Sequence, residues 1–231
     1  LIDKMLKYLI NLLFPKLCLG CNALLLNNEK IICSECNHNL PITNHHFLEH
    51  NDTTKKFYGI IPIEFSASML YFHHKGIVQN LIHNLKYKNH QEVGSLLGKW
   101  YAKDLENVSQ IQTLSEIIPV PLHKKRLEER GYNQVTTFCE ALSKELEIPY
   151  NPNLLYRSRY SKTQTRRDKE NRKDIANSLF DVNFTEADHN KHFLLVDDVM
   201  TSGATLEACA KALLKIPNSK VSIVTIAYTL S

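Results

Sequence analysis

The stretch over residues 192–205 constrains the fold of this chain more than any other. It begins as an apolar run of strand character, reaches two adjacent carboxylates at Asp197 and Asp198, and turns through residues 201–203 into a helical pattern from about Ala204. A buried strand that feeds a helix through a short loop aims unpaired backbone N–H groups at one point. The stretch therefore predicts an α/β sheet with a phosphate site at the helix N-terminus.

The two carboxylates come at the carboxyl end of the predicted strand, where open α/β sheets bind their ligands. Carboxylates next to a phosphate would repel an anion, so we expect Asp197 and Asp198 to accept hydrogen bonds from sugar hydroxyls. The alternative is an ordinary strand end followed by an N-cap Thr or Ser. That alternative accounts for any one of these features but not for their order, so the stretch predicts a sugar-phosphate site.

Glycine content, chain length and apolar content further limit the fold and the cellular compartment that the sequence predicts. The seven glycines form neither the P-loop motif G-x-x-x-x-G-K-[ST] nor the dinucleotide-binding motif G-x-G-x-x-G, which excludes these two competing phosphate-binding loops. A chain of 231 residues with 43% apolar content can bury one α/β core and a small appendage. No run of 18 apolar residues occurs, so no membrane span is predicted. Residues 1–14 have apolar side chains at helical spacing, which indicates an amphipathic helix rather than a signal peptide and predicts a cytoplasmic protein.

Four cysteines near the N-terminus form two C-x2-C pairs, Cys18 with Cys21 and Cys33 with Cys36. Eleven residues separate the pairs, a spacing typical of a tetrahedral Zn²⁺ site with four thiolates. Two disulfides are the alternative, which a reducing compartment disfavours, and redox C-x-x-C motifs do not come as matched pairs. We therefore predict structural zinc, because four sulfur ligands leave no open position for catalysis.

The middle of the chain predicts further strands and helices. One or two strands are expected over 57–72, helices over 75–87 and 92–105, and a buried strand over 220–228. A strand over 116–123 precedes a basic loop over 124–134 and a helix over about 133–146, which form half of a βαβ unit. His123 and Lys124 are thereby placed to contact a diphosphate, although a solvated charged turn accounts for this segment equally well.

Basic residues are concentrated in one segment, Arg157 to Lys173. It holds eight Lys or Arg against Asp168 and Glu170, in a chain whose net charge is only +4. With almost no apolar content, the segment is expected to be a mobile loop or a polar helix that a ligand orders. Its charge favours a polyanionic partner, while the simpler alternative is a solvated face.

Residues 196–205 resemble the phosphoribosyl pyrophosphate (PRPP) loop of type I phosphoribosyltransferases, and the chain as a whole resembles the ComF family, which includes ComFC and GntX-like proteins. The double cysteine motif and the PRPP loop are the most specific features. The others are Leu85-Lys86-Tyr87, Pro119-Val120-Pro121, Arg130-Gly131-Tyr132-Asn133-Gln134, and Gln164 with Arg167 and Asn171.

The resemblance implies a type I phosphoribosyltransferase-like parallel sheet flanked by helices, over residues 57–231. It implies an N-terminal zinc-ribbon-like module over residues 1–56. Asp197 and Asp198 would be the catalytic acids, and Mg²⁺ would accompany PRPP. The expected PRPP-binding residues are Val199, Met200, Thr201, Ser202, Gly203, Ala204, Thr205, His123, Lys124, Arg166 and Arg167.

For competence proteins of this family, the implied role is natural transformation, in which the protein would handle incoming single-stranded DNA with the DNA-uptake machinery. Three functions stay open at this point. The chain could be an active phosphoribosyltransferase of nucleotide salvage, a DNA-handling protein that keeps the pocket for ligand binding, or a regulator that senses PRPP. No acceptor-activating base is identifiable in the sequence.

Overall fold

The computed structural model describes residues 14–158 and 179–230. The predicted N-terminal helix lies outside these ranges, apart from Phe14. Most of the basic segment, including Arg166 and Arg167, also lies outside them. These predictions therefore stay predictions.

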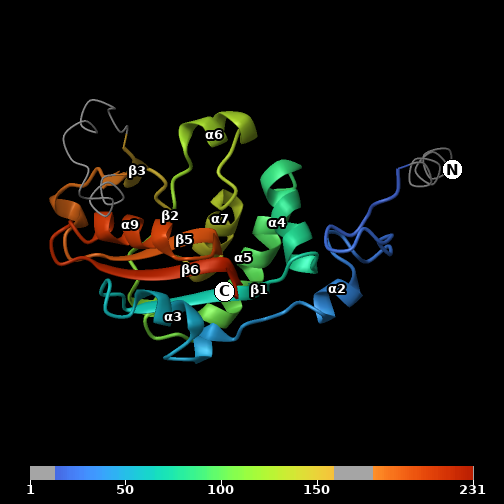
Figure 1. Cartoon of the computed structure of the whole chain (residues 1–231), viewed down its shortest axis with the longest axis horizontal. Helices are drawn as coiled ribbons and strands as arrows, with labels where there is room; N and C mark the ends of the chain where they lie inside the picture. The colour runs from blue at the N-terminus through green and yellow to red at the C-terminus, as the bar shows by residue number, and fades with distance from the viewer. Residues whose placement is uncertain (1–13, 159–178, 231) are drawn as a thin grey trace.

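A four-stranded parallel sheet forms the centre of the molecule (Figure 1). Its strands run in the order β1 (Phe65–Phe72), β6 (Lys220–Thr229), β5 (His192–Met200) and β2 (Glu116–Pro119). The central strands β5 and β6 are buried on both faces, which is why their sequences are mostly apolar. The predicted α/β class with a parallel sheet is confirmed.

Helices cover both faces of this sheet. The first face packs against α4 (Ile77–Tyr87), α5 (Glu92–Leu105) and α7 (Thr136–Leu146). On the second face lies α9 (Ala204–Leu213), together with a small antiparallel pair, β3 (Leu155–Arg157) and β4 (Phe180–Val182). Because all four strands are parallel, their carboxyl ends lie at the same edge of the sheet. Helix α9 begins at this edge, and α4 ends there.

The loop after β2 differs from the prediction of an irregular basic segment. It contains a two-turn helix, α6 (Lys124–Arg130), which buries none of its side chains and projects from the top of the molecule in Figure 1. Helix α7 begins at Thr136 rather than Asn133. The Asn133 side chain instead bridges the loop, donating to the Val120 carbonyl at 2.9 Å and accepting from the Val135 N–H at 3.3 Å.

The edge of β1 is covered by the segment that follows the cysteines. The Tyr71 N–H donates to the Pro41 carbonyl at 2.8 Å, and the Asn51 side chain donates to the Ser66 carbonyl at 2.8 Å. This segment includes the short helix α3 (Asp52–Phe57) and a 3₁₀ turn over His45–Phe47. The domain boundary expected after residue 56 falls inside α3, and it remains a prediction. Two further 3₁₀ turns lie at Ile111–Thr113 and Glu186–Asp188.

The cysteine module packs directly on α4. The Asn80 side chain donates to the Gly20 carbonyl at 2.7 Å, and the Asn84 side chain donates to the Leu19 carbonyl at 2.9 Å. A Cβ added at Gly20 would lie 2.9 Å from Ile77 Cγ2, so only glycine allows this approach. The module therefore shares one hydrophobic core with the helices on the first face of the sheet.

Candidate ligand site at the carboxyl end of β5

The acid pair predicted to bind ribose lies at the carboxyl end of β5. Asp198 is buried, and its Oδ2 lies 2.7 Å from the Lys86 Nζ in the last turn of α4. Its Oδ1 accepts a hydrogen bond from the Val199 N–H. The order of the sheet brings the end of α4 against the end of β5, so the cation and the acid meet although they are far apart in the sequence. The predicted acid site thus includes a lysine that sequence reasoning did not assign.

Asp197 points to the other side of the strand and has a different environment. Its carboxylate accepts a hydrogen bond from the Asp198 N–H at 2.8 Å. Burial, and next the charge of Asp198, raises the pKa of Asp197 to about 8. Asp197 is therefore protonated more readily than a free carboxylate, and Lys86 offsets the charge of Asp198. A pair with little net charge repels a phosphate less than two free carboxylates would.

The loop after β5 forms the predicted turn. Thr201 and Ser202 are exposed, and Gly203 has a φ of +82°, in the left-handed region that favours glycine. Gly203 is the N-cap of α9 and has no side chain to cap it, and in the first turn the Ala204 N–H makes a long hydrogen bond to the Ser202 Oγ, at 3.4 Å. Ala204 and Thr205 are exposed in this turn. The N–H groups at the start of α9 are therefore accessible to an anion, as the sequence predicts.

Two of the expected PRPP-binding residues lie in β5 itself. Val199 lines a cavity of about 480 Å³ together with Asp198, Thr201, Lys86 and Arg126. We call it the acid-pair cavity, although of the two acids only Asp198 lines it. The Met200 side chain is instead buried in the core on the second face of the sheet. Any ligand contact from Met200 would therefore come from its backbone.

His123 and Lys124 lie at the start of α6 and are both exposed. The His123 ring caps the helix by accepting from the Lys125 N–H at 3.2 Å, and the Lys124 Nζ lies 3.6 Å from the Glu128 carboxylate. The residue of α6 that lines the acid-pair cavity is Arg126. The contacts of His123 and Lys124 with PRPP stay predictions, and Arg126 is a residue that sequence reasoning missed.

Arg130, Tyr132 and Lys86 were visible in the sequence as parts of short motifs, but the motifs gave them no role. In the structure Arg130 lies over the Tyr87 ring, 4.9 Å from its centroid, and the Tyr132 hydroxyl donates to the Leu85 carbonyl at 2.6 Å. These contacts hold the end of α6 against the end of α4. Their common signal was charge or aromatic character in a loop or at the end of a helix, which does not by itself indicate a site.

The four cysteines Cys18, Cys21, Cys33 and Cys36 converge, with all sulfur atoms within 4.8 Å of one another. The Cys21 and Cys33 sulfurs are 3.7 Å apart, close to the roughly 3.8 Å expected between sulfurs bound to one Zn²⁺ at 2.3 Å in a tetrahedron. None of the cysteines forms a disulfide. This arrangement fits a zinc-ribbon module and can hold a metal ion.

Backbone donors favour thiolate in this cluster. The Cys18 sulfur accepts from the Gly20 N–H at 3.4 Å and from the Cys33 N–H at 3.2 Å. Burial acts to raise the pKa of Cys18, but the backbone donors outweigh it and lower that pKa to about 7. Since the thiolate is the form that binds metal, Cys18 is prepared for a cation, whereas burial and the neighbouring cysteine side chains raise the pKa of Cys36.

Comparisons with known proteins place these features in a family. A family model described as the phosphoribosyl transferase domain matches residues 136–231. Competence protein F of Haemophilus influenzae is 29% identical over 62% of this chain and 64% of its own length. The DNA utilization protein YhgH of Shigella flexneri is 29% identical over 65% and 66%, and Competence protein ComFC of Bacillus subtilis is 30% identical over 43% and 38%.

The chain belongs to the ComF family. Each ComF match spans less than two thirds of the relative's own length. Among solved structures, a hypoxanthine phosphoribosyltransferase from Staphylococcus aureus aligns with 58% of this chain and 62% of its own, at 18% identity and a TM-score of 0.36.

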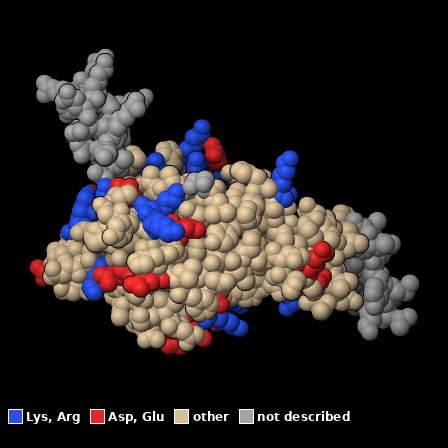
Figure 2. All heavy atoms as spheres, turned by 60° about the horizontal axis from the view of Figure 1, so that its bottom comes forward, with Lys and Arg blue, Asp and Glu red and all other residues tan. Residues whose placement is uncertain are grey.

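The described surface of this ComF protein carries mixed charge. On the face shown in Figure 2, most Lys and Arg side chains lie next to Asp or Glu. Within the part of the chain that the structure describes, no helix is long and apolar enough to cross a bilayer.

Proposed function

We propose that this ComF protein binds PRPP at the carboxyl end of β5 and handles incoming single-stranded DNA during natural transformation. The observation that carries the first part is the sequence of acid pair, left-handed Gly203 and uncapped α9 at the ends of parallel strands. The names of the relatives, Competence protein F and DNA utilization protein YhgH, support the second part. A cytoplasmic location stays a prediction, to which six unpaired cysteines lend support.

In the proposed complex, Asp197 and Asp198 accept hydrogen bonds from the ribose hydroxyls, and the N–H groups at the start of α9 bind the 5′-phosphate. The diphosphate lies toward Lys86 and Arg126, the two cations of the acid-pair cavity. Mg²⁺ in such sites is held by ligand phosphates, waters and one or two carboxylates, and Asp197 has no ion-pair partner among the described residues. When bound, Mg²⁺ would neutralise charge on a departing pyrophosphate.

Zinc is proposed for the four-cysteine cluster. The donor set of four sulfurs suits Zn²⁺, and the short Cys21–Cys33 separation supports one ion shared by both pairs. Because the module shares its core with α4, loss of the ion is expected to loosen the helix that carries Lys86.

Isothermal calorimetry tests the PRPP proposal. Asp198→Ala should weaken PRPP binding more than pyrophosphate binding, because it removes a contact to the ribose and leaves the phosphate contacts in place. Glu140→Ala, on the exposed side of α7, is the matched control for loss of one carboxylate. Equal losses for the two ligands would place the ribose elsewhere and overturn the proposal.

The DNA part has a separate test. Affinity for a single strand should fall steeply with salt. Replacing both Arg166 and Arg167 by Ala should flatten the log–log slope by about one unit or a little more, since each neutralised phosphate contributes roughly 0.7. Equal slopes for parent and variant would leave the cysteine module as the remaining DNA contact. If Mg²⁺–PRPP changes the DNA affinity, DNA must change the PRPP affinity by the same factor, which would identify a regulator. Product formation from PRPP and a nucleobase would identify a transferase.

A further inference from the structure

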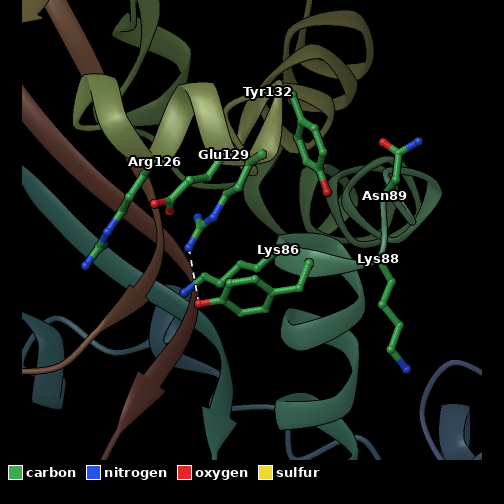
Figure 3. Close-up of a pocket in the computed structure, with 8 residues that line it drawn as sticks. Lys86, Lys88, Asn89, Arg126, Glu129 and Tyr132 are labelled. Carbon is green, nitrogen blue, oxygen red and sulfur yellow. Dashed lines mark hydrogen bonds between the residues drawn. The ribbon is translucent and has the colours of Figure 1, made fainter.

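A second cavity lies between the C-terminal end of α4 and helix α6 (Figure 3). Its volume is about 720 Å³, within the range of small-molecule sites. Among the described residues, four cations line it, Lys86, Lys88, Arg126 and Arg130, against one acid, Glu129. Lys86 and Arg126 also line the acid-pair cavity, so the two spaces share a wall.

Most of the positive charge in this cavity is not neutralised by the protein. The side chains of Lys88 and Arg126 have no hydrogen-bond or ion-pair partner among the described residues. Arg130 donates only to neutral groups, Gln134 Oε1 at 2.7 Å and the Tyr87 hydroxyl at 3.3 Å. Glu129 lies 3.9 Å from a different cation, Lys125, at the exposed side of α6. Three cations are therefore available to an anion.

The cavity also offers a flat aromatic surface. The Tyr87 side chain is 63% exposed at the end of α4. The Arg130 guanidinium lies over this ring, 4.9 Å from its centroid, and both residues line the cavity. Planar guanidinium and aromatic groups are the surfaces on which nucleobases stack. The Asn89 side chain, at the rim, adds an amide that can pair with a base edge.

We propose that this cavity is a second ligand subsite, which binds a phosphate-bearing nucleotide unit next to the phosphoribosyl subsite. The unit is either a free nucleotide or one residue of a single strand. The identity of the neighbouring subsite rests on the proposed function. The two ligands would lie on either side of Lys86 and Arg126, and the residues that line only the second subsite include Lys88, Asn89 and Arg130.

The ordinary explanation for Lys86 and Lys88 is that cations stabilise the C-terminal end of a helix by interacting with its dipole. That explanation requires neither the free Arg126 on a different helix nor the enclosed volume between the two. It predicts that removing Lys88 changes stability slightly and ligand binding not at all. The two explanations therefore differ in a measurable way.

The test uses the full chain and the variant Lys88→Ala, because Lys88 is exposed and makes no side-chain contact that folding would need. Lys99→Ala, an exposed lysine of α5 that lines neither cavity, is the matched control. Binding of a labelled oligothymidylate is measured by fluorescence anisotropy over a range of salt. Thymidine 5′-monophosphate and thymidine are added as competitors, and PRPP binding is measured separately by calorimetry.

We expect Lys88→Ala to weaken binding about fivefold at low salt, the loss of one solvent-exposed ion pair, and to lower the salt slope by about 0.7. The PRPP affinity of Lys88→Ala should equal that of the parent. The Lys99→Ala control should bind the oligothymidylate with the parent's affinity and salt slope. If thymidine 5′-monophosphate competes and thymidine does not, a free nucleotide is sufficient to occupy the subsite. If only the oligothymidylate binds, the ligand is a nucleotide within a single strand. Either result supports the subsite.

Three results would overturn the inference. One is a parent protein that binds neither strand nor monophosphate. Another is a Lys88→Ala variant with the parent's affinity and slope. The last is a Lys88→Ala variant whose PRPP affinity falls by the same factor as its nucleotide affinity, which would make the cavity part of the PRPP subsite. If the parent fails to bind PRPP but Lys88→Ala still weakens nucleotide binding, the proposed function fails and the second subsite stands.

Discussion

The ion pair between Lys86 and Asp198 gives the sharpest test of the site. The two charged atoms are 2.7 Å apart, and the side chains are 21% and 7% exposed. At an effective dielectric of about 20, unit charges at this distance attract by about 6 kcal/mol, and desolvation of both groups offsets part of that attraction. Removing one partner of a buried pair typically costs about 3–5 kcal/mol. Because Lys86 keeps some contact with water, we expect Lys86→Met to destabilise the protein by about 3 kcal/mol.

A double-mutant cycle separates the ion pair from lost packing. Urea unfolding is measured for the parent, Lys86→Met, Asp198→Asn and the double variant at one pH and salt concentration. The double variant should be more stable than Lys86→Met, because its site no longer contains an unpaired buried carboxylate. We expect a coupling energy of about 2 kcal/mol, while Lys99→Met on the surface of α5 should change stability by less than about 0.5 kcal/mol. Additive effects of the two substitutions would refute the pairing and with it the balanced charge of the acid site.

Three further outcomes are expected. The pKa of Asp197 in the folded protein is about 8 and exceeds its ordinary value of 3.8, so the native state holds a proton that the unfolded chain releases. Stability should therefore fall as pH rises from 6 to 8, by up to about 1.4 kcal/mol per pH unit. Asp197→Asn should remove that slope in urea titrations, and an unchanged slope would contradict the assignment. Purified protein should contain one zinc ion by metal analysis, and Cys18→Ser should lose the ion and unfold the module, whereas metal-free protein with the parent's melting temperature would exclude structural zinc. Gly203→Val should abolish PRPP binding, since a side chain there is strained at φ +82° and a Cβ would lie 3.4 Å from Phe57; retained binding would place the pocket elsewhere. The control Gly131→Ala, at φ +78° in open space, should cost about 1–2 kcal/mol of stability and keep PRPP binding.

The sequence by itself determined the features that are local in the chain. The run into Asp197 and Asp198, the turn at Gly203 and the helix after it are specified by consecutive residues, and the structure forms them as β5, a left-handed N-cap and α9. The cysteine pairs were equally predictable, because a C-x2-C turn directs two sulfurs to one point whatever surrounds it. The buried strand β6 followed from its mostly apolar sequence, in which Ser222 and Thr225 are the short polar exceptions before Tyr228.

The prediction over 124–134 was wrong in its secondary structure for a physical reason. A helix of seven residues that buries no side chain has no apolar periodicity, so its sequence is indistinguishable from that of a charged loop. Its ends are fixed instead by the His123 cap and by Gly131 at φ +78°. Arg126 consequently reaches the acid-pair cavity from a position that the loop prediction could not supply.

Only the tertiary structure decided which charges act together. Lys86 reads in the sequence as an ordinary cation in the last turn of a helix, and nothing in its neighbourhood indicates Asp198 as its partner. The strand order β1-β6-β5-β2 places the end of α4 at the end of β5, and burial then makes their ion pair strong. The sugar-phosphate loop is thus encoded in one continuous segment, whereas the cations around it are assembled by the packing of helices, since side-chain proximity between distant segments depends on topology rather than on local pattern.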